Sequence, residues 1–503
     1  MSGAMQRVSR FLDDDRNKAL LVILFFFAWW VVFGLQSYEL YSDDDMAHFL
    51  MARYALHHPM IYLDMWGRPL FTLLYTPIAQ VGLHAARFQS ALICASVCWL
   101  SFVYAKERGY ARAWLAPLIL AIMPRFYWMS FNLDTALLLC LVLTGALVLY
   151  AKERYALAAV VISLSPAARP EGVLFIMVFA AAFIYRKKWS AVPLAFAGPF
   201  IWNLVGFFTS GDPLWLIHNQ PWTVPYGRGE FLHYFIRFME ITGPGHAALF
   251  IAGAVYCVWK WREKDNFLLF TMWLVYFLFL VFAWWQGAFS TLGLTRYFNG
   301  TAPIVAVITL AGINRLLDGE RGLVDVVTAA AIALSAVFFV ASGASYTVHF
   351  IVTVSVMAAL RAAILLKGWT RPAMGAVVAG LFALGLMFYV PLHPPGLNAE
   401  HSMNQAAAQW YDTNAPGRYV LCTSLWFAHF AKMDPYDPAR FAPLTRYNLD
   451  SAPAGTVVFW EPHYAGGDRY SGVSIEELAN DPSYKLAWSN MEGYYFIFEK
   501  VGG

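Results

Sequence analysis

The segment with the clearest capacity for chemistry contains three consecutive aspartates, Asp43, Asp44 and Asp45, followed by His48. Adjacent carboxylates repel one another, so in a desolvated pocket at least one of them should have a raised pKa, which suits a general base. The same set could instead hold a divalent cation. Asp44 and His48 stand four residues apart, so a helix that starts here would place them on one face.

A second aspartate triplet, Asp13-Asp14-Asp15, serves as an internal comparison, because it lies among Arg10, Arg16 and Lys18 and indicates solvated charge. For Asp43 to Asp45 the structural alternative is an acidic helix start that caps free backbone amides and favours the helix dipole. Local sequence does not separate the two triplets. Only their positions along the chain do.

Arg68, in Trp66-Gly67-Arg68-Pro69, ends the loop that the aspartates begin. We expect it to bind phosphate, because a guanidinium holds phosphate through two parallel hydrogen bonds. Arg169 and Glu171 flank Pro170 at the start of an apolar run. They could contact a substrate, or they could close on each other as a structural ion pair.

Two further sites lie beside apolar runs. Asp134 could add a carboxylate to a metal or acceptor site, or it could cap the helix that follows it. Arg296-Tyr297 comes after Trp284-Trp285-Gln286 and could bind substrate, although aromatic residues at such positions often form an interfacial belt.

The elements that position these residues are membrane helices. Of the 503 residues, 59% are hydrophobic and only 13% are charged, which is more apolar surface than a soluble core of this length buries. The net charge of +3 is too small and dispersed for nucleic-acid binding. The chain lacks the phosphate loop, the His-Glu-x-x-His zinc helix and the Gly-x-Ser-x-Gly elbow, which argues against nucleotide-driven pumps and hydrolases of those types.

Apolar runs predict about thirteen transmembrane helices between the N-terminus and residue 391. Basic clusters fall in alternate turns, which the positive-inside rule assigns to the cytoplasm. The short run from Pro69 to Gly82 is best interpreted as an interfacial helix, since this keeps every basic cluster inside. The clusters are Arg7/Arg10/Lys18, Lys106/Arg108/Arg112, Lys152/Arg154, Arg186/Lys187/Lys188, Lys260/Arg262/Lys264, Arg315/Arg321 and Arg361/Lys367/Arg371.

With this topology, every lysine before residue 392 is cytoplasmic, whereas the basic residues at the outer side are all arginines. Topology penalises both residue types outside, so the retained arginines indicate an anionic ligand. The alternative for any single arginine is that it snorkels or pairs with a carboxylate. The outer arginines are Arg53, Arg68, Arg87, Arg125, Arg169, Arg228, Arg237 and Arg296.

We therefore expect two domains. Residues 1–391 form an all-α polytopic transmembrane domain with a first outer loop at 37–68 and a second long outer loop at 209–244. Residues 392–503 form a small soluble extracytoplasmic α/β domain, with strands near 419–423, 456–460 and 494–499 and a helix near 406–411.

An aspartate-rich motif at the outer end of the first helix resembles that of the GT-C superfamily of membrane glycosyltransferases. The chain is most similar to the branch of lipid A aminoarabinose transferases and protein O-mannosyltransferases. Their Asp-Glu-x-x-Tyr-like motif is matched by Asp44-Asp45-Met46-Ala47-His48, with Asp for Glu and His for Tyr. Arg68-Pro69 and Ala86-Arg87 extend the match over the N-terminal third. Beyond about residue 175, it consists of helix number and composition.

The resemblance implies transfer of a sugar, with inversion, from a polyprenyl-phosphate donor to a lipid, glycan or protein acceptor, as in glycan or lipopolysaccharide biosynthesis of the cell envelope. Asp44 would deprotonate the acceptor, Asp43 or Asp45 would orient it, and Arg68 and Arg296 would stabilise the leaving phosphate. The substitutions within the motif leave open which aspartate is the base. Arginines could suffice without a cofactor, and a divalent cation stays an alternative.

The implied location is a bacterial inner membrane, with the site and the C-terminal domain facing the periplasm or exterior. An oligosaccharide ligase with a diphosphate-linked donor would use the same groups. A lipid or sugar flippase would instead need ionisable residues near mid-span, whereas the charges here gather at helix ends. A non-catalytic assembly protein would leave the aspartates and outer arginines without a role.

Overall fold

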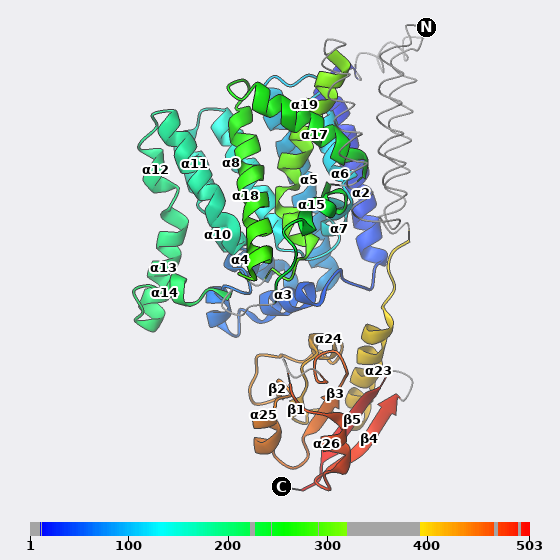
Figure 1. Ribbon diagram of the computed structural model, residues 1–503. Coiled ribbons are helices and arrows are strands. Elements are labelled where there is room, and N and C mark those ends of the chain that lie inside the picture. Colours follow the sequence, from blue (N-terminus) through cyan, green and yellow to red (C-terminus); the bar gives the residue numbers. More distant parts are fainter. Residues whose placement is uncertain are drawn as a thin grey trace. The chain divides into compact units, whose positions relative to one another are not determined.

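The computed structural model divides the chain into two compact units, whose elements are drawn in Figure 1. The helical unit comprises Met1–Leu35, Leu63–Phe71 and Arg87–His393, and the sheet unit comprises Gln36–Tyr62, Thr72–Ala86 and Pro394–Gly503. The structure describes residues 11, 13–221, 227–242, 244–289, 291–318, 393–466, 471–490 and 494–502.

The helical unit consists of apolar α-helices joined by short turns. Four helical stretches are long and apolar enough to cross a membrane: Asp15–Gln36, Leu83–Glu107, Asn266–Gln286 and Thr295–Arg315. The expectation of a polytopic, mainly helical fold is confirmed at this level. Residues 319–392, where further spans are predicted, lie outside the described part, so the predicted number of about thirteen stays a prediction.

The described helices of this unit follow one another in chain order. They are α2 (Asp15–Gln36), α5 (Leu83–Glu107), α6 (Leu115–Ala121), α7 (Pro124–Met129), α8 (Ala136–Ala151), α9 (Tyr155–Ile162), α10 (Ser165–Ala168), η2 (Pro170–Gly172), α11 (Val173–Tyr185), α12 (Ala191–Leu194), α13 (Ala197–Ser210), α14 (Trp215–His218), α15 (His233–Ile236), α16 (Phe238–Thr242), α17 (Pro244–Trp259), α18 (Asn266–Gln286), η4 (Thr295–Thr301) and α19 (Ala302–Asp318). The predicted outer loop 209–244 therefore carries the short helices α14, α15 and α16.

Helices α17 and α19 pack with their backbones in close approach because glycines face each other across the contact. A Cβ added to Gly253 would lie 1.8 Å from the carbonyl oxygen of Ile308, and one added to Gly312 would lie 2.1 Å from that of Leu249. Neither position accepts a side chain. Small residues at such contacts are typical of helix pairs in membranes, where close packing replaces the hydrophobic driving force.

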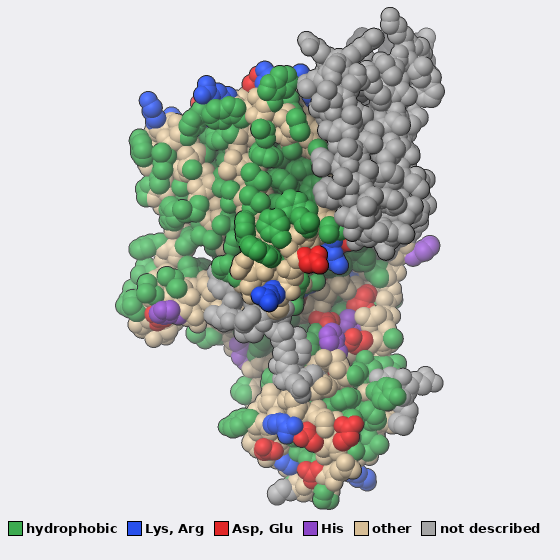
Figure 2. All heavy atoms as spheres, in the orientation of Figure 1, with side chains coloured by type: hydrophobic (Ala, Val, Ile, Leu, Met, Phe, Trp, Pro, Cys, Tyr) green, Lys and Arg blue, Asp and Glu red, His purple; other side chains and the backbone are tan. Residues whose placement is uncertain are grey.

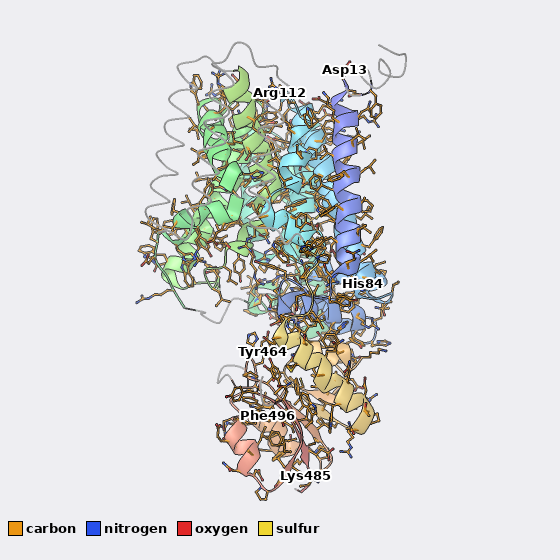
Figure 3. All side chains as sticks on the ribbon, turned by 90° about the vertical axis from the view of Figure 1, so that its right-hand side faces the viewer. Asp13, His84, Arg112, Tyr464, Lys485 and Phe496 are labelled. Carbon is orange, nitrogen blue, oxygen red and sulfur yellow. The ribbon has the colours of Figure 1, made fainter. Side chains whose placement is uncertain are left out.

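One end of the helical unit gathers basic residues around a buried carboxylate. Asp265, before α18, is ion-paired with Arg108, which follows α5, and with Arg186, which follows α11. Lysine and arginine side chains cluster at this end (Figure 2). Asp13 and Arg112 lie at the same end (Figure 3), so the first aspartate triplet shares its surroundings with basic residues.

The sheet unit contains a five-stranded mixed sheet in the order β2-β1-β3-β5-β4. Strand β1 pairs in parallel with β2 and β3, whereas β5 is antiparallel to both β3 and β4. Its elements are α3 (Asp43–Tyr54), η1 (Pro59–Leu63), α23 (Ala399–Asn414), β1 (Val420–Leu421), α24 (Leu425–Phe430), β2 (Phe441–Ala442), α25 (Arg446–Ser451), β3 (Val457–Trp460), α26 (Ile475–Asn480), β4 (Tyr484–Asn490) and β5 (Tyr495–Lys500).

Strand β3 is buried on both faces, which explains its continuous apolar run. Val457 and Phe459 pack into one hydrophobic core, and Val458 and Trp460 pack into a second core on the opposite face. Because successive side chains of a strand alternate between faces, an unbroken apolar run marks a strand covered on both sides. The predicted strands near 419–423, 456–460 and 494–499 correspond to β1, β3 and β5, and the predicted helix near 406–411 is the middle of α23.

Helix α4 (Pro69–Ala79) begins in the helical unit and ends in the sheet unit. With 11 residues it is roughly 16 Å long, which is too short to cross a hydrocarbon layer of about 30 Å. This length agrees with an interfacial helix rather than a span.

Candidate active site

Helix α3 places the second aspartate triplet in its first turn. Ser42 is the N-cap residue with extended backbone (φ −152°), but its side chain makes no capping hydrogen bond. The helix thus begins with three acidic residues next to its free amides, where negative charge is favoured by the helix dipole. Asp45 and His48 are buried, with 3% and 5% of their surface exposed, whereas Asp43 and Asp44 are partly exposed.

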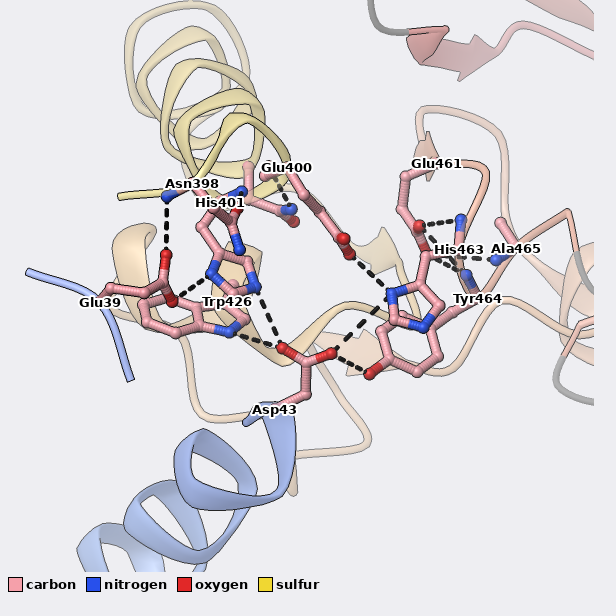
Figure 4. A network of polar contacts seen from close by, with 11 residues as sticks. Glu39, Asp43, Asn398, Glu400, His401, Trp426, Glu461, His463, Tyr464 and Ala465 are labelled. Atoms are coloured by element: carbon pink, nitrogen blue, oxygen red, sulfur yellow. Dashed lines mark hydrogen bonds and ion pairs between the residues drawn. The ribbon is translucent and has the colours of Figure 1, made fainter. Parts of the chain in front are cut away.

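The carboxylate of Asp43 is held by side chains from the C-terminal part of the chain (Figure 4). Its Oδ1 lies 3.0 Å from Nε2 of His401 and accepts a hydrogen bond from Nε1 of Trp426, also at 3.0 Å. Its Oδ2 accepts a hydrogen bond from the hydroxyl of Tyr464. Burial disfavours the charged form, but the hydrogen bonds of His401 and Tyr464 outweigh it and lower the pKa of Asp43 to about 2.

His401 lies between two carboxylates. Its Nδ1 is 2.6 Å from Oε1 of Glu39, and the other oxygen of Glu39 accepts the backbone N–H of Asn398 at 2.7 Å. Burial lowers the pKa of His401, but the hydrogen bonds and charges of Asp43 and Glu39 raise it to about 9. The ring stacks on Trp426, with centroids 4.0 Å apart. At neutral pH His401 is therefore an imidazolium.

The loop that supplies Tyr464 is built around the buried carboxylate of Glu461. That carboxylate accepts backbone N–H groups of His463 at 2.7 Å, Tyr464 at 2.9 Å and Ala465 at 3.1 Å (Figure 4). Tyr464 thereby has a fixed backbone from which its hydroxyl reaches Asp43.

These contacts narrow the choice of general base within the triplet. A carboxyl group with a pKa of about 2 is a weak proton acceptor near neutral pH, so Asp43 is poorly suited to be a general base. The expected rise of a pKa by mutual repulsion does not hold for Asp43. Within the described part of the chain, the group able to hold a metal ion combines Asp43 with Glu400 and His401 rather than with the other aspartates.

In the helical unit, Arg169 and Glu171 form a buried ion pair, with Nε of Arg169 2.6 Å from Oε1 of Glu171. The hydroxyl of Tyr276 donates to Glu171 at 3.2 Å, and the guanidinium of Arg169 lies 5.0 Å from the ring centre of Tyr297. Arg169 and Glu171 thus form the structural ion pair that the sequence offered as the alternative to substrate binding. The pair also fixes the ring of Tyr297.

Asp134 lies just before α8 and contacts two elements. One carboxylate oxygen accepts the backbone N–H of Ala136 at 2.8 Å, and the other accepts the side-chain amide of Asn299 in η4, also at 2.8 Å. Asp134 thus supports the start of α8, as its structural alternative suggests, and it joins this helix to the segment that carries Arg296 and Tyr297.

Arg68 has a left-handed backbone conformation, with φ of 58°, directly before Pro69. Such a conformation is unfavourable for a residue with a Cβ and is found mainly where a fixed local geometry is needed. Its Nη1 donates to the carbonyl oxygen of Met65 at 2.7 Å. The charge of Arg68 acts on both Glu171 and Tyr297, and the charge of Arg296 acts on Tyr297.

The predicted site residues fall into two sets. The helical unit brings together Arg68, Asp134, Arg169, Glu171, Arg296 and Tyr297, which we call the arginine set. The sheet unit contains Asp43, Asp44, Asp45 and His48, together with residues that the sequence did not indicate: Glu39, His401, Trp426 and Tyr464. No local motif marks these four, because His401 and Asp43 are separated by 358 residues.

Two other arginines that the sequence places on the outer side make structural contacts. Arg87 is buried and donates to the carbonyl oxygen of Gly34 at 3.2 Å, and Nη2 of Arg125 donates to the hydroxyl of Thr295 at 2.5 Å. For Arg87 and Arg125 the structural role suggested by the sequence is therefore the one observed.

The fold of this chain is similar to that of a protein of known structure. ArnT from Cupriavidus metallidurans is similar over 99% of both chains at 14% identity, with TM-scores of 0.63 when bound to undecaprenyl phosphate and 0.60 in the apo state. The apo oligosaccharyltransferase of Archaeoglobus fulgidus gives a TM-score of 0.49 at 13% identity, over 96% of this chain and 74% of that chain. No family model matches the sequence, and no curated protein sequence is significantly similar to it. At the level of the fold, the expected resemblance is confirmed: this chain has the same fold as ArnT.

Proposed function

We propose that this protein is an inverting glycosyltransferase that moves a sugar from a polyprenyl-phosphate donor to a lipid, glycan or protein acceptor. The ArnT-like fold over 99% of the chain carries the proposal, because the compared protein binds undecaprenyl phosphate. Such a transfer needs a proton acceptor and cations for a phosphate: within the sheet unit Asp44 is a partly exposed carboxylate, and within the helical unit the arginine set offers guanidinium groups.

Asp44 is the proposed general base. Asp43 is engaged by three donors and Asp45 is buried, whereas Asp44 shares the first helical turn with them and is partly exposed. Asp44 would take the proton of the acceptor hydroxyl while that oxygen bonds to the anomeric carbon. Such assistance typically contributes about 10² to 10⁴ in rate. Asp45 and His48 would shape the acceptor side of the site.

The arginine set is proposed to handle the donor phosphate. As the bond between the anomeric carbon and the phosphate oxygen breaks, its electron pair stays on the phosphate, and the polyprenyl phosphate leaves with one more negative charge. Arg68 and Arg296 would stabilise this charge. Arg169 and Glu171 would hold Tyr297 in place, since they already neutralise each other.

We further propose that the transmembrane domain spans residues 1–391, with outer loops 37–68 and 209–244, and that residues 392–503 form an extracytoplasmic domain. The reaction would take place at the outer side of a bacterial inner membrane. The basic end of the helical unit supports this orientation, because lysine and arginine are retained on the cytoplasmic side.

The proposal is tested by incubating purified protein with a panel of polyprenyl-phosphate sugars and measuring free polyprenyl phosphate by mass spectrometry. Release with at least one donor in the presence of an acceptor is expected. A parallel panel of diphosphate-linked oligosaccharides distinguishes a ligase. Absence of release with every monophosphate donor would rule the proposed reaction out.

A further inference from the structure

His401 combines burial, charge and contacts with the start of α3. Only 6% of its side chain is exposed, and each ring nitrogen faces a different carboxylate: Nδ1 faces Glu39 at 2.6 Å and Nε2 faces Asp43 at 3.0 Å. A neutral imidazole carries one N–H donor, so satisfying both carboxylates requires the doubly protonated ring. Stacking on the face of Trp426 favours the same cation.

The two carboxylates are placed so that His401 fixes the entry into α3. Glu39 lies in the segment that leads into the helix, and Asp43 is its first residue. Glu39 also accepts the backbone N–H of Asn398, whose side chain caps α23 by accepting the N–H of His401. One end of α23 is thereby attached at two points to the segment of residues 39–43.

We propose that His401 is a positioning residue for Asp44: as an imidazolium clamped between Glu39 and Asp43, it fixes the first turn of α3 and hence the direction of the neighbouring carboxylate. This inference rests on the proposed function of Asp44. His401 does not act on the substrate. It acts through the backbone that Asp43 and Asp44 share.

The charged and titratable groups of the network around His401 come from three segments of the chain: residues 39–44, helix α23 and the loop after β3. They are Glu39 before α3, Asp43 and Asp44 at its start, Glu400 in α23, and Glu461, His463 and Tyr464 after β3. His463, the other histidine of this network, lies 2.9 Å from Glu400 and 3.9 Å from Asp43. The carboxylates of the network outnumber its histidines. The clamp is therefore stable while His401 is protonated.

The sign of the pH dependence follows from the raised pKa of His401. Its ordinary pKa is 6.5 and its pKa in the folded protein is about 9. The stabilisation by the clamp is thus complete below about pH 6.5 and is lost as the pH rises through about 9. Loss of the proton would remove the hydrogen bond from His401 to one of the two carboxylates and loosen its hold on the first turn of α3.

The test uses the full-length protein and a polyprenyl-phosphate sugar that the wild type turns over. His401→Gln should lower kcat about 10- to 100-fold at pH 7 with little change in the KM for the donor, and it should remove the alkaline decline near pH 9. Glu39→Gln should move that decline to lower pH by about one unit. A purely structural role would leave the position of the decline unchanged.

His58→Gln is the matched control, because His58 forms another histidine–carboxylate pair in the sheet unit, 2.9 Å from Asp434. It should leave kcat and the alkaline decline unchanged. An equal effect of His58→Gln, or a wild-type profile without an alkaline decline, would overturn the positioning role.

Thermal unfolding in detergent separates this inference from the proposed function, because it needs no substrate. The apparent Tm of the wild type should fall between pH 6.5 and 9 by more than that of His401→Gln. Zn²⁺ or EDTA should change neither profile. If Zn²⁺ raised the Tm of the wild type but not of His401→Gln, the same side chains would be metal ligands, and the clamp would be wrong.

Discussion

The two aspartate triplets have the same three letters and each lies at the start of a helix, but their surroundings differ. In the first, Asp14 accepts the backbone N–H of Arg16 at 2.9 Å, and Asp15 pairs with Lys18 at 3.4 Å; both contacts are local, the first exposed and the second partly exposed. In the second, Asp43 is held by three side chains from beyond residue 400. The difference between the triplets therefore comes from distant parts of the chain, which contact the second triplet, and not from the local sequence.

The two triplets should differ most in the rate of sugar transfer when the middle aspartate of each, Asp44 or Asp14, is replaced by asparagine. Asp44→Asn removes the proposed base and should reduce sugar transfer by about 10² to 10⁴, with an unchanged Tm. Asp14→Asn should leave transfer within twofold of the wild type. The measurement is the initial rate of polyprenyl phosphate release, and equal losses in both variants would show that position does not separate the triplets.

The next difference concerns stability. Asp43→Asn removes the charge that the buried imidazolium of His401 faces and should destabilise the sheet unit by about 2 to 3 kcal/mol. Asp15→Asn removes a partly exposed pair and should cost less than about 1 kcal/mol. Thermal unfolding of both variants at pH 6 makes the comparison. A Tm of Asp43→Asn equal to that of the wild type would contradict the observed network.

A smaller effect distinguishes the cations that accompany each triplet. Arg68→Lys keeps the charge but loses the paired N–H groups, so the KM for the donor should rise about tenfold. Lys18→Arg, beside the first triplet, should change neither KM nor kcat. Titration of the donor with each variant tests this. An unchanged KM in Arg68→Lys would show that Arg68 does not bind the donor phosphate through paired hydrogen bonds.

The smallest effect is expected on mild acidification. The pKa of Asp43 is lowered from 3.8 to about 2, so its stabilising contribution persists above about pH 4 and is lost only as the pH falls toward 2. The Tm difference between wild type and Asp43→Asn should therefore be the same at pH 5 and pH 6. A difference that shrinks by half over this interval would mean that Asp43 titrates at a higher pH.

The features that could be predicted from the sequence are those that depend on residues close together along the chain. The apolar runs indicated the helical unit, and the burial of Val457 to Trp460 on both faces of the sheet explains why a continuous apolar run marked a strand. Strand β4 was missed because it lies at the edge of the sheet and its exposed residues show no regular alternation. The ion pair of Arg169 and Glu171 could be foreseen from the sequence as one of two interpretations, because the two residues are only two positions apart.

The contacts of Asp43 were not predictable in this way. His401, Trp426 and Tyr464 are separated from it by more than 350 residues, and each is an ordinary residue of a polar domain when considered alone. Only the tertiary fold shows that Asp43, the first acid of the triplet, is engaged by these side chains, which supports Asp44 as the base that the resemblance already implied.

The most direct test of Asp44 as a base, rather than as a nucleophile, is the anomeric configuration of the product. A general base supports a single displacement, so NMR of the transferred sugar should show inversion relative to the donor. A retained configuration would require two displacements through a covalent intermediate. That result would contradict the proposed mechanism.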